Sequence, residues 1–167
     1  NIHPTDKQTI GTRLALAVRT LVYDPAVNHP TKSNLSPMVK DYVVNEDGSV
    51  TISFDNVYDL VCQEYVKTDD YKIVATPLET NEIKWFSVLT QSGTLKYANA
   101  VLENNKVTVS CSEPFTAIRY AWDRCPGGLN LYSKSSEEGV FLPVGPFYID
   151  LQPTEFGINE FTSSVGK

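Results

Sequence analysis

The Asp24-Pro25 dipeptide divides this sequence into two parts with different structural periods. A residue that precedes proline is held out of the α region, so a helix that approaches Pro25 has to end there. Before this point, apolar residues recur at helical spacing. Beyond Pro37 they form short runs rich in β-branched and aromatic side chains. The chain therefore combines one amino-terminal helix with a β-rich unit.

Residues 1–23 predict an amphipathic α-helix. Their apolar side chains fall on one stripe of a helix: Ile10, Leu14, Ala17, Val18, Leu21 and Val22. Thr5 and Gln8 have the spacing of a capping box, and Asp6 suits the positive end of the helix dipole. A single helix has to bury such a stripe against another element. We expect that this element does not belong to the β-rich unit that follows.

Residues 24–37 are interpreted as a linker, because they contain three prolines and no periodic pattern. Compact hairpin connections are expected at Asn45–Gly48 and Glu103–Asn105. The unit 38–151 is expected to be mainly β, an antiparallel β-sandwich, with a barrel as the alternative that periodicity does not separate. Eight runs predict its strands: Met38–Val44, Ser49–Phe54, Tyr71–Ala75, Ile83–Leu89, Lys96–Leu102, Lys106–Cys111, Ala117–Trp122 and Phe147–Leu151. A long loop is expected over 123–146, and a tail without a strong pattern over 152–167.

Charge and composition argue against several classes of partner. The net charge is −6 and no basic cluster occurs, so neither nucleic acid nor an anionic membrane is an expected partner. The apolar run Leu14–Val22 is far shorter than the roughly 20 residues of a membrane span. The three cysteines have no C-x-x-C spacing, so neither a structural zinc site nor a thioredoxin-type pair is expected. Asn34-Leu35-Ser36 fits the N-glycosylation pattern, which makes Asn34 a candidate acceptor.

His3 is the candidate catalytic side chain. It lies in Ile2-His3-Pro4, directly ahead of the capped helix, so a rigid element would hold it while it projects from a loop. The positive end of a helix favours neutral imidazole, which suits a general base. The alternative is an inert histidine in a turn. His29, in the linker, is interpreted as solvated and inert.

Aromatic residues are concentrated in the last third of the β-rich unit, where they could have either of two roles. They can line a sugar-binding platform, although packing in the core or at a sheet edge is the commoner role. No G-x-S-x-G or other nucleophile motif accompanies them. The residues concerned are Tyr120, Trp122, Tyr132, Phe141, Phe147 and Tyr148.

Two segments carry a resemblance to a known family. The first, from Ile2 to Ala17, reads I-H-P-x-x-K-Q-x-x-G-x-R-L-A-L-A; the second, over 119–147, reads R-Y-A-W, then N-L-Y, then L-P-x-x-P-F. Both resemble the sialate O-acetylesterases and related carbohydrate acetylesterases. The resemblance extends from Asn1 to about Asp150, and between the two segments it is carried mainly by the β pattern.

The resemblance implies a serine hydrolase that removes O-acetyl groups from sialic acids or related sugars, with no metal or cofactor. In this family an SGNH-type α/β domain supplies a serine that a histidine activates. The histidine of the I-H-P motif maps onto His3 as the general base. The serine lies upstream in the family, so this chain alone is expected to lack the nucleophile. Asn1 stands where many relatives have aspartate, so the acid of the triad is expected upstream, or another group orients His3.

The resemblance also implies a division of the chain. Residues 1–23 would be the last helix of the hydrolase domain, and 38–151 its β-sandwich carboxyl-terminal domain. The expected partners are an O-acetylated sugar substrate and the amino-terminal SGNH portion of the same protein, in a lysosomal or extracellular location. Whether the chain is a processed subunit or a fragment stays open. The alternative function is a non-catalytic β-sandwich that binds glycans or a partner.

Overall fold

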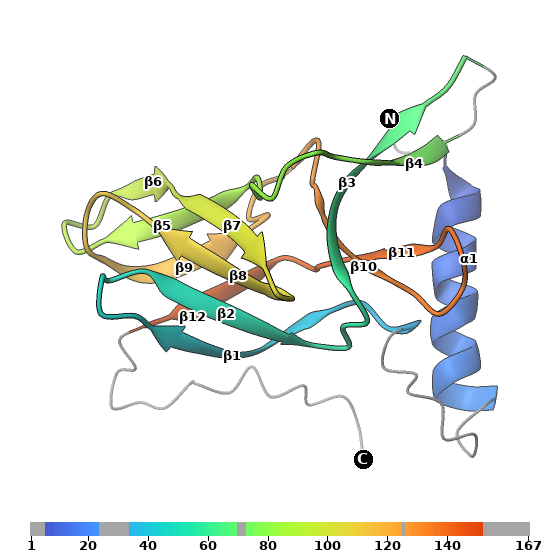
Figure 1. Cartoon of the computed structure of the whole chain (residues 1–167), viewed down its shortest axis with the longest axis horizontal. Helices are drawn as coiled ribbons and strands as arrows, with labels where there is room; N and C mark the ends of the chain where they lie inside the picture. Colours follow the sequence, from blue (N-terminus) through green and yellow to red (C-terminus); the bar gives the residue numbers. More distant parts are fainter. Residues whose placement is uncertain (1–5, 24–33, 70–72, 125, 152–167) are drawn as a thin grey trace.

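The computed structural model describes residues 6–23, 34–69, 73–124 and 126–151, and these form one helix followed by a β-rich body (Figure 1). The helix α1 (Lys7–Val18) continues into a π-helical turn, η1 (Arg19–Tyr23). Twelve strands follow within the described residues: β1 (Met38–Val44), β2 (Val50–Asp55), β3 (Leu60–Lys67), β4 (Ile73–Pro77), β5 (Phe86–Thr90), β6 (Leu95–Tyr97), β7 (Asn99–Glu103), β8 (Lys106–Ser110), β9 (Phe115–Tyr120), β10 (Leu131–Lys134), β11 (Phe141–Pro143) and β12 (Phe147–Asp150).

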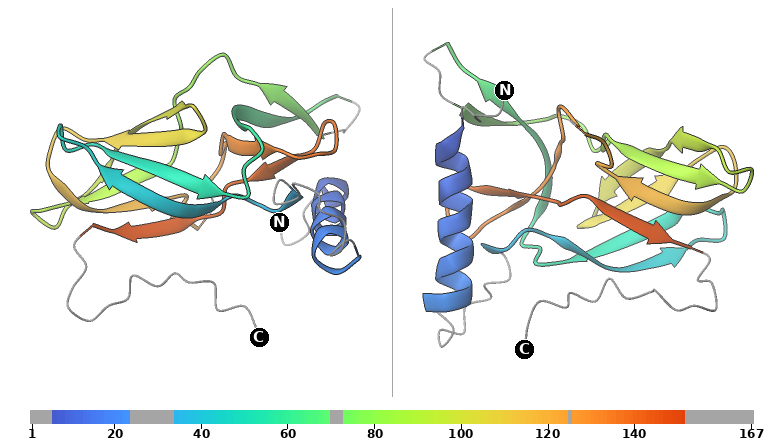
Figure 2. Two further views of the ribbon diagram at one scale, coloured as in Figure 1. Left: turned by 60° about the horizontal axis from the view of Figure 1, so that its bottom comes forward. Right: turned by 180° about the vertical axis from the view of Figure 1, so that it is seen from behind.

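The strands form three antiparallel four-stranded sheets, which confirms the prediction of a mainly β, sandwich-like unit. The sheets β1-β2-β8-β7 and β12-β9-β5-β6 pack against each other, and β11-β10-β3-β4 extends from them towards α1 (Figures 1 and 2). Both predicted hairpins are present. Asn104 and Asn105 have φ of 51° and 60°, which suits a tight turn between β7 and β8, and Gly48 has φ of 80° between β1 and β2.

Three predictions of local structure were wrong. The run Lys96–Leu102 is two strands, β6 and β7, which belong to different sheets because the chain crosses over at Ala98. The expected loop 123–146 contains β10 and β11, whose three or four residues are too few to show a period. Strand β3 was not predicted, because Gln63 and Glu64 interrupt its apolar pattern; pairing with β10 and β4 holds it in place.

Aromatic rings cluster in the core between the two packed sheets, and one pair of rings crosses from sheet to sheet. Phe86 of β5 lies 4.8 Å from Tyr120 of β9 between ring centroids, and Tyr120 stacks on Phe147 of β12 at 5.4 Å. Phe54 of the opposite sheet meets Phe147 at 6.1 Å. The packing interpretation of Tyr120 and Phe147 is therefore confirmed. It does not extend to Trp122, which is 56% exposed.

We expect Phe86→Ala to lower the free energy of unfolding by about 3–5 kcal/mol, because Phe86 is 1% exposed and its removal leaves a cavity between the sheets. Val43→Ala on β1 is the matched control. Since Val43 is 60% exposed, its loss should change the same quantity by less than about 0.5 kcal/mol. Urea denaturation followed by circular dichroism measures both, and equal effects would contradict this core.

Candidate functional site

The histidine at the centre of the sequence prediction lies outside the described residues. Asn1 to Thr5, including His3, and residues 24–33, including His29, are not described. The catalytic role of His3 therefore stays a prediction. The tail 152–167 also lies outside, and the proposed domain boundaries stay predictions too. The structure does place the helix that follows His3.

The cap of this helix differs in position from the one predicted. The Asp6 side chain accepts a hydrogen bond from the backbone N–H of Thr9 at 2.9 Å, so Asp6 is the N-cap. Thr5, the predicted cap, lies outside the described residues. A carboxylate is favoured at this end because it faces the positive end of the helix dipole. The helix end next to the I-H-P segment is thus held by its own first turn.

Arg13 joins α1 to the third sheet. Its Nε donates to the carbonyl oxygen of Phe141 at 2.8 Å. Its guanidinium carbon lies 5.1 Å from the ring centroid of Tyr65 and 5.8 Å from that of Tyr132. Burial raises the pKa of Tyr132, and the nearby Arg13 charge acts in the opposite direction. The buried Nη2 of Arg13 has no hydrogen-bond partner among the described residues.

This contact brings the two family-like segments together. Arg13 lies in the first and Tyr132 in the second, and sequence alone gave no sign of Tyr65 between them. Asn130, also in the second segment, is 1% exposed; its amide donates to the Glu82 carbonyl and accepts from the Lys84 N–H. These residues of the second segment therefore hold the fold and anchor the helix.

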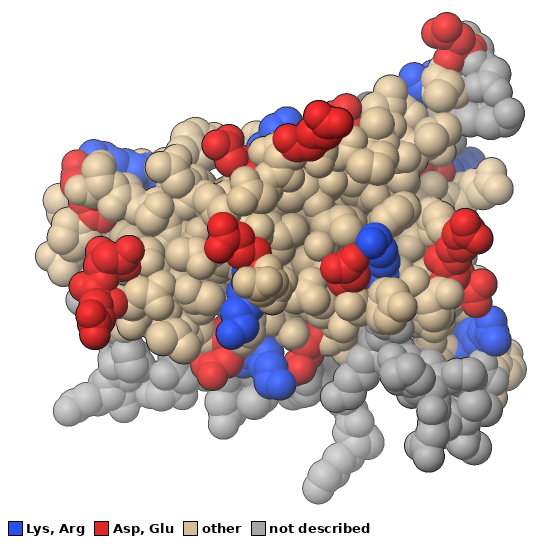
Figure 3. Space-filling model, viewed as in Figure 1, with Lys and Arg blue, Asp and Glu red and all other residues tan. Residues whose placement is uncertain are grey.

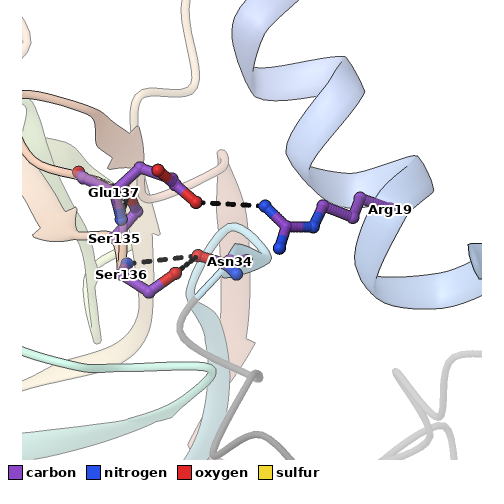
Figure 4. A network of polar contacts seen from close by, with 5 residues as sticks. All are labelled: Arg19, Asn34, Ser135, Ser136 and Glu137. Carbon is purple, nitrogen blue, oxygen red and sulfur yellow. Dashed lines mark hydrogen bonds and ion pairs between the residues drawn. The ribbon is translucent and has the colours of Figure 1, made fainter. Parts of the chain in front are cut away.

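A second contact lies near the end of the helix (Figure 4). Arg19 donates to the Glu137 carboxylate at 3.2 Å. The amide oxygen of Asn34 accepts from the Ser136 N–H at 3.1 Å and from its hydroxyl at 2.7 Å. Asn34 is 7% exposed, so this predicted glycan acceptor is an internal hydrogen-bonding group here. Its modification stays a prediction.

The predicted apolar stripe of α1 faces away from the β-rich body. Leu16 is the buried side chain of the helix, at 6% exposure. Because a helix turns by about 100° per residue, Leu16 and Arg13 lie on a different side from the stripe. Five of its six residues are 39% to 63% exposed, namely Ile10, Leu14, Val18, Leu21 and Val22, whereas Ala17 is half-buried. The described residues therefore leave this stripe uncovered, as expected if its partner lies elsewhere.

No group of three or more His, Cys, Asp or Glu side chains is placed to hold a metal ion in the described ranges. None of the helices in the described part combines the length and apolar character of a membrane span. Cys62 and Cys111 are free thiols, and burial raises the pKa of Cys62.

Comparison with known proteins identifies a structural neighbour. The chain resembles a carbohydrate acetylesterase from Xanthomonas citri, with a TM-score of 0.62 and 24% sequence identity. The match covers 91% of this chain and 30% of that protein, so the chain spans about a third of its neighbour's length. No family model matches the chain, and neither does any of the curated proteins compared. This likeness shows that the chain and its neighbour share a fold.

We expect Arg13→Lys to loosen α1, because lysine loses the planar stacking on Tyr65 and Tyr132. Amide hydrogen exchange in α1 should become about tenfold faster, which corresponds to about 1.4 kcal/mol. Arg19→Lys is the matched control, since its contact with Glu137 is exposed and keeps its charge. Exchange measured by mass spectrometry should be nearly unchanged in this control. Equal acceleration in both variants would show that Arg13 is not the anchor.

Proposed function

We propose that this chain is the carboxyl-terminal part of a sialate O-acetylesterase-type serine hydrolase, to which it contributes the catalytic base His3. The observation that carries the proposal is the exposed stripe of α1. One side of this helix is anchored by Arg13, and the other presents Leu14 and its apolar neighbours to solvent, directly after the I-H-P segment. Such a stripe needs a partner, and an amino-terminal hydrolase portion would cover it.

The likeness to a carbohydrate acetylesterase supports the reaction class, hydrolysis of a carboxylic ester on a sugar. That neighbour is more than three times as long as the matched part, which leaves ample length for a domain bearing the nucleophile. The finer proposal, that the sugar is a sialic acid, rests on the resemblance of the two sequence segments. So does the proposed lysosomal or extracellular location.

In this mechanism His3 moves protons and needs no cofactor. Its imidazole accepts the proton of the upstream serine hydroxyl as the serine oxygen bonds to the acetyl carbonyl carbon. The bond between that carbon and the sugar oxygen then breaks, and His3 returns the proton to the leaving sugar oxygen. In the second half, His3 accepts a proton from water as the water oxygen attacks the acetyl-serine. The serine oxygen leaves with that proton, and acetate is released.

The alternative function is a non-catalytic module that binds glycans or another partner through the β-rich body. The observation that favours it is the exposure of Trp122 at the end of β9. In that case His3 has no catalytic role. Catalysis and binding are measured separately, so the two functions are distinguishable.

Acetate release from an O-acetylated sialic acid tests the proposed reaction. We expect none from this chain alone and turnover from a chain extended upstream through the proposed hydrolase portion. His3→Ala in the extended protein should lower kcat by about 10⁴-fold or more, because the serine loses its base. The matched control is His29→Ala, which should leave turnover unchanged. Near-normal turnover of His3→Ala would refute the assignment.

A charge placed on the stripe tests whether a partner covers it. Leu14→Asp should change the stability of the 167-residue chain by less than about 0.5 kcal/mol, because Leu14 is 63% exposed there. In the extended protein the same charge would be buried without a partner, and turnover or folding should be lost. Thr12→Asp is the matched control, since Thr12 lies on another side of α1 and is exposed. Full turnover of extended Leu14→Asp would contradict a covered stripe.

A further inference from the structure

One face of the sheet β12-β9-β5-β6 carries aromatic side chains around a single arginine. Strand register aligns Tyr148, Arg119, Ser87 and Tyr97 in one row across the four strands. Side chains alternate along β9, so Ile118 and Tyr120 point into the core while Arg119 points outward. We call this row, together with Trp122, the outer aromatic face. Its strands are nearest the viewer in the right panel of Figure 2.

The Arg119 guanidinium packs against aromatic rings and does not pair with a carboxylate among the described residues. Its guanidinium carbon lies 5.7 Å from the ring centroid of Tyr148 and 6.0 Å from that of Trp122. The two rings are 6.2 Å apart. Across the described ranges, no carboxylate forms an ion pair with Arg119, and its buried Nε has no hydrogen-bond partner. The two rings therefore fix the guanidinium in place, and no described carboxylate competes for its N–H groups.

Large aromatic surfaces are exposed at both ends of the row. Trp122 is 56% exposed and Tyr97 is 76% exposed. Next to Tyr97, the indole of Trp85 lies at 6.4 Å and is fixed by its N–H, which donates to the Gly127 carbonyl at 2.7 Å. Neighbouring strands are about 4.8 Å apart, so the row is about 14 Å wide. That width suits a short oligosaccharide rather than a single ring.

A groove adjoins the end of the row that carries Trp122. It has a volume of about 730 Å³, runs between the edge strands β1 and β12, and is lined in part by Trp122 and Tyr148. Tyr42 of β1 donates its hydroxyl to the Asp150 carbonyl of β12 at 3.2 Å, which links its two sides. A ligand stacked on Trp122 thus has a concave surface beside it.

We propose that the outer aromatic face binds a neutral polysaccharide chain. Aromatic rings offer flat apolar surfaces for the C–H faces of pyranose rings, and the Arg119 guanidinium donates to hydroxyl and ring oxygens. The net charge of −6 disfavours an anionic polymer. Figure 3 shows acidic and basic side chains interspersed over the opposite face of the molecule, which lies towards β1, β2, β7 and β8. Binding here requires no ester cleavage and is independent of His3.

The test is affinity electrophoresis of the 167-residue chain in gels that contain arabinoxylan, galactomannan or mixed-linkage β-glucan, with polygalacturonate as the anionic comparison. We expect at least one neutral polymer to retard the chain. Trp122→Ala should weaken that binding by about tenfold or more, as loss of an aromatic anchor does. Tyr97→Ala and Arg119→Lys should also weaken it. Tyr58→Ala is the matched control, because Tyr58 is 63% exposed between β2 and β3 and lies outside the face.

Thermal melting of each variant tests whether the chain is still folded. The proposal is overturned if no neutral polymer retards the chain, if only polygalacturonate does, or if Trp122→Ala binds as Tyr58→Ala does. His3→Ala should bind the polymer like the original chain. Esterase activity is expected only in the extended protein, so its loss there in His3→Ala tests the proposed reaction separately from polymer binding by the 167-residue chain.

Discussion

The contact of Arg13 with Tyr65, Tyr132 and the Phe141 carbonyl determines how this molecule presents its surfaces. It joins a helix near the amino terminus to a sheet formed 50 to 130 residues later. Because Arg13 has a planar guanidinium with several donors, it can stack on a ring and donate a hydrogen bond at once. That contact fixes the rotation of α1 and leaves its apolar stripe facing outward.

The β-rich body serves as a rigid support for two separate surfaces. The rings of Phe86, Tyr120 and Phe147 pack together on the inner face of one sheet, and Phe147 meets Phe54 of the opposite sheet. Strand β9 therefore presents Tyr120 inward and Arg119 outward. The stripe lies on α1 at one end of the molecule, and the outer aromatic face lies on the β12-β9-β5-β6 sheet (Figure 2). One surface suits an apolar partner domain and the other a sugar chain.

Much of the local structure was predictable because it depends on neighbours in sequence. Turn residues predicted both hairpins, and β1 has the predicted bounds Met38–Val44. Strands β3, β10 and β11 were missed because they are held by pairing rather than by pattern; Ser133, for example, is fully buried between its partners. The resemblance supplied His3 as the candidate base. The periodicity of the chain does not predict where the His3 side chain lies.

The sequence by itself determined that residues 7–23 are helical, that the described part of 38–151 is mainly antiparallel β, and that the helix carries an apolar stripe. Proline sterics, turn residues and periodicity act over a few residues, so they can be read directly. Only the tertiary structure decided which side of α1 is buried and that Trp122 is exposed while Tyr120 is enclosed. Those outcomes depend on contacts such as Arg13 with Phe141, 128 residues apart, which no local pattern encodes.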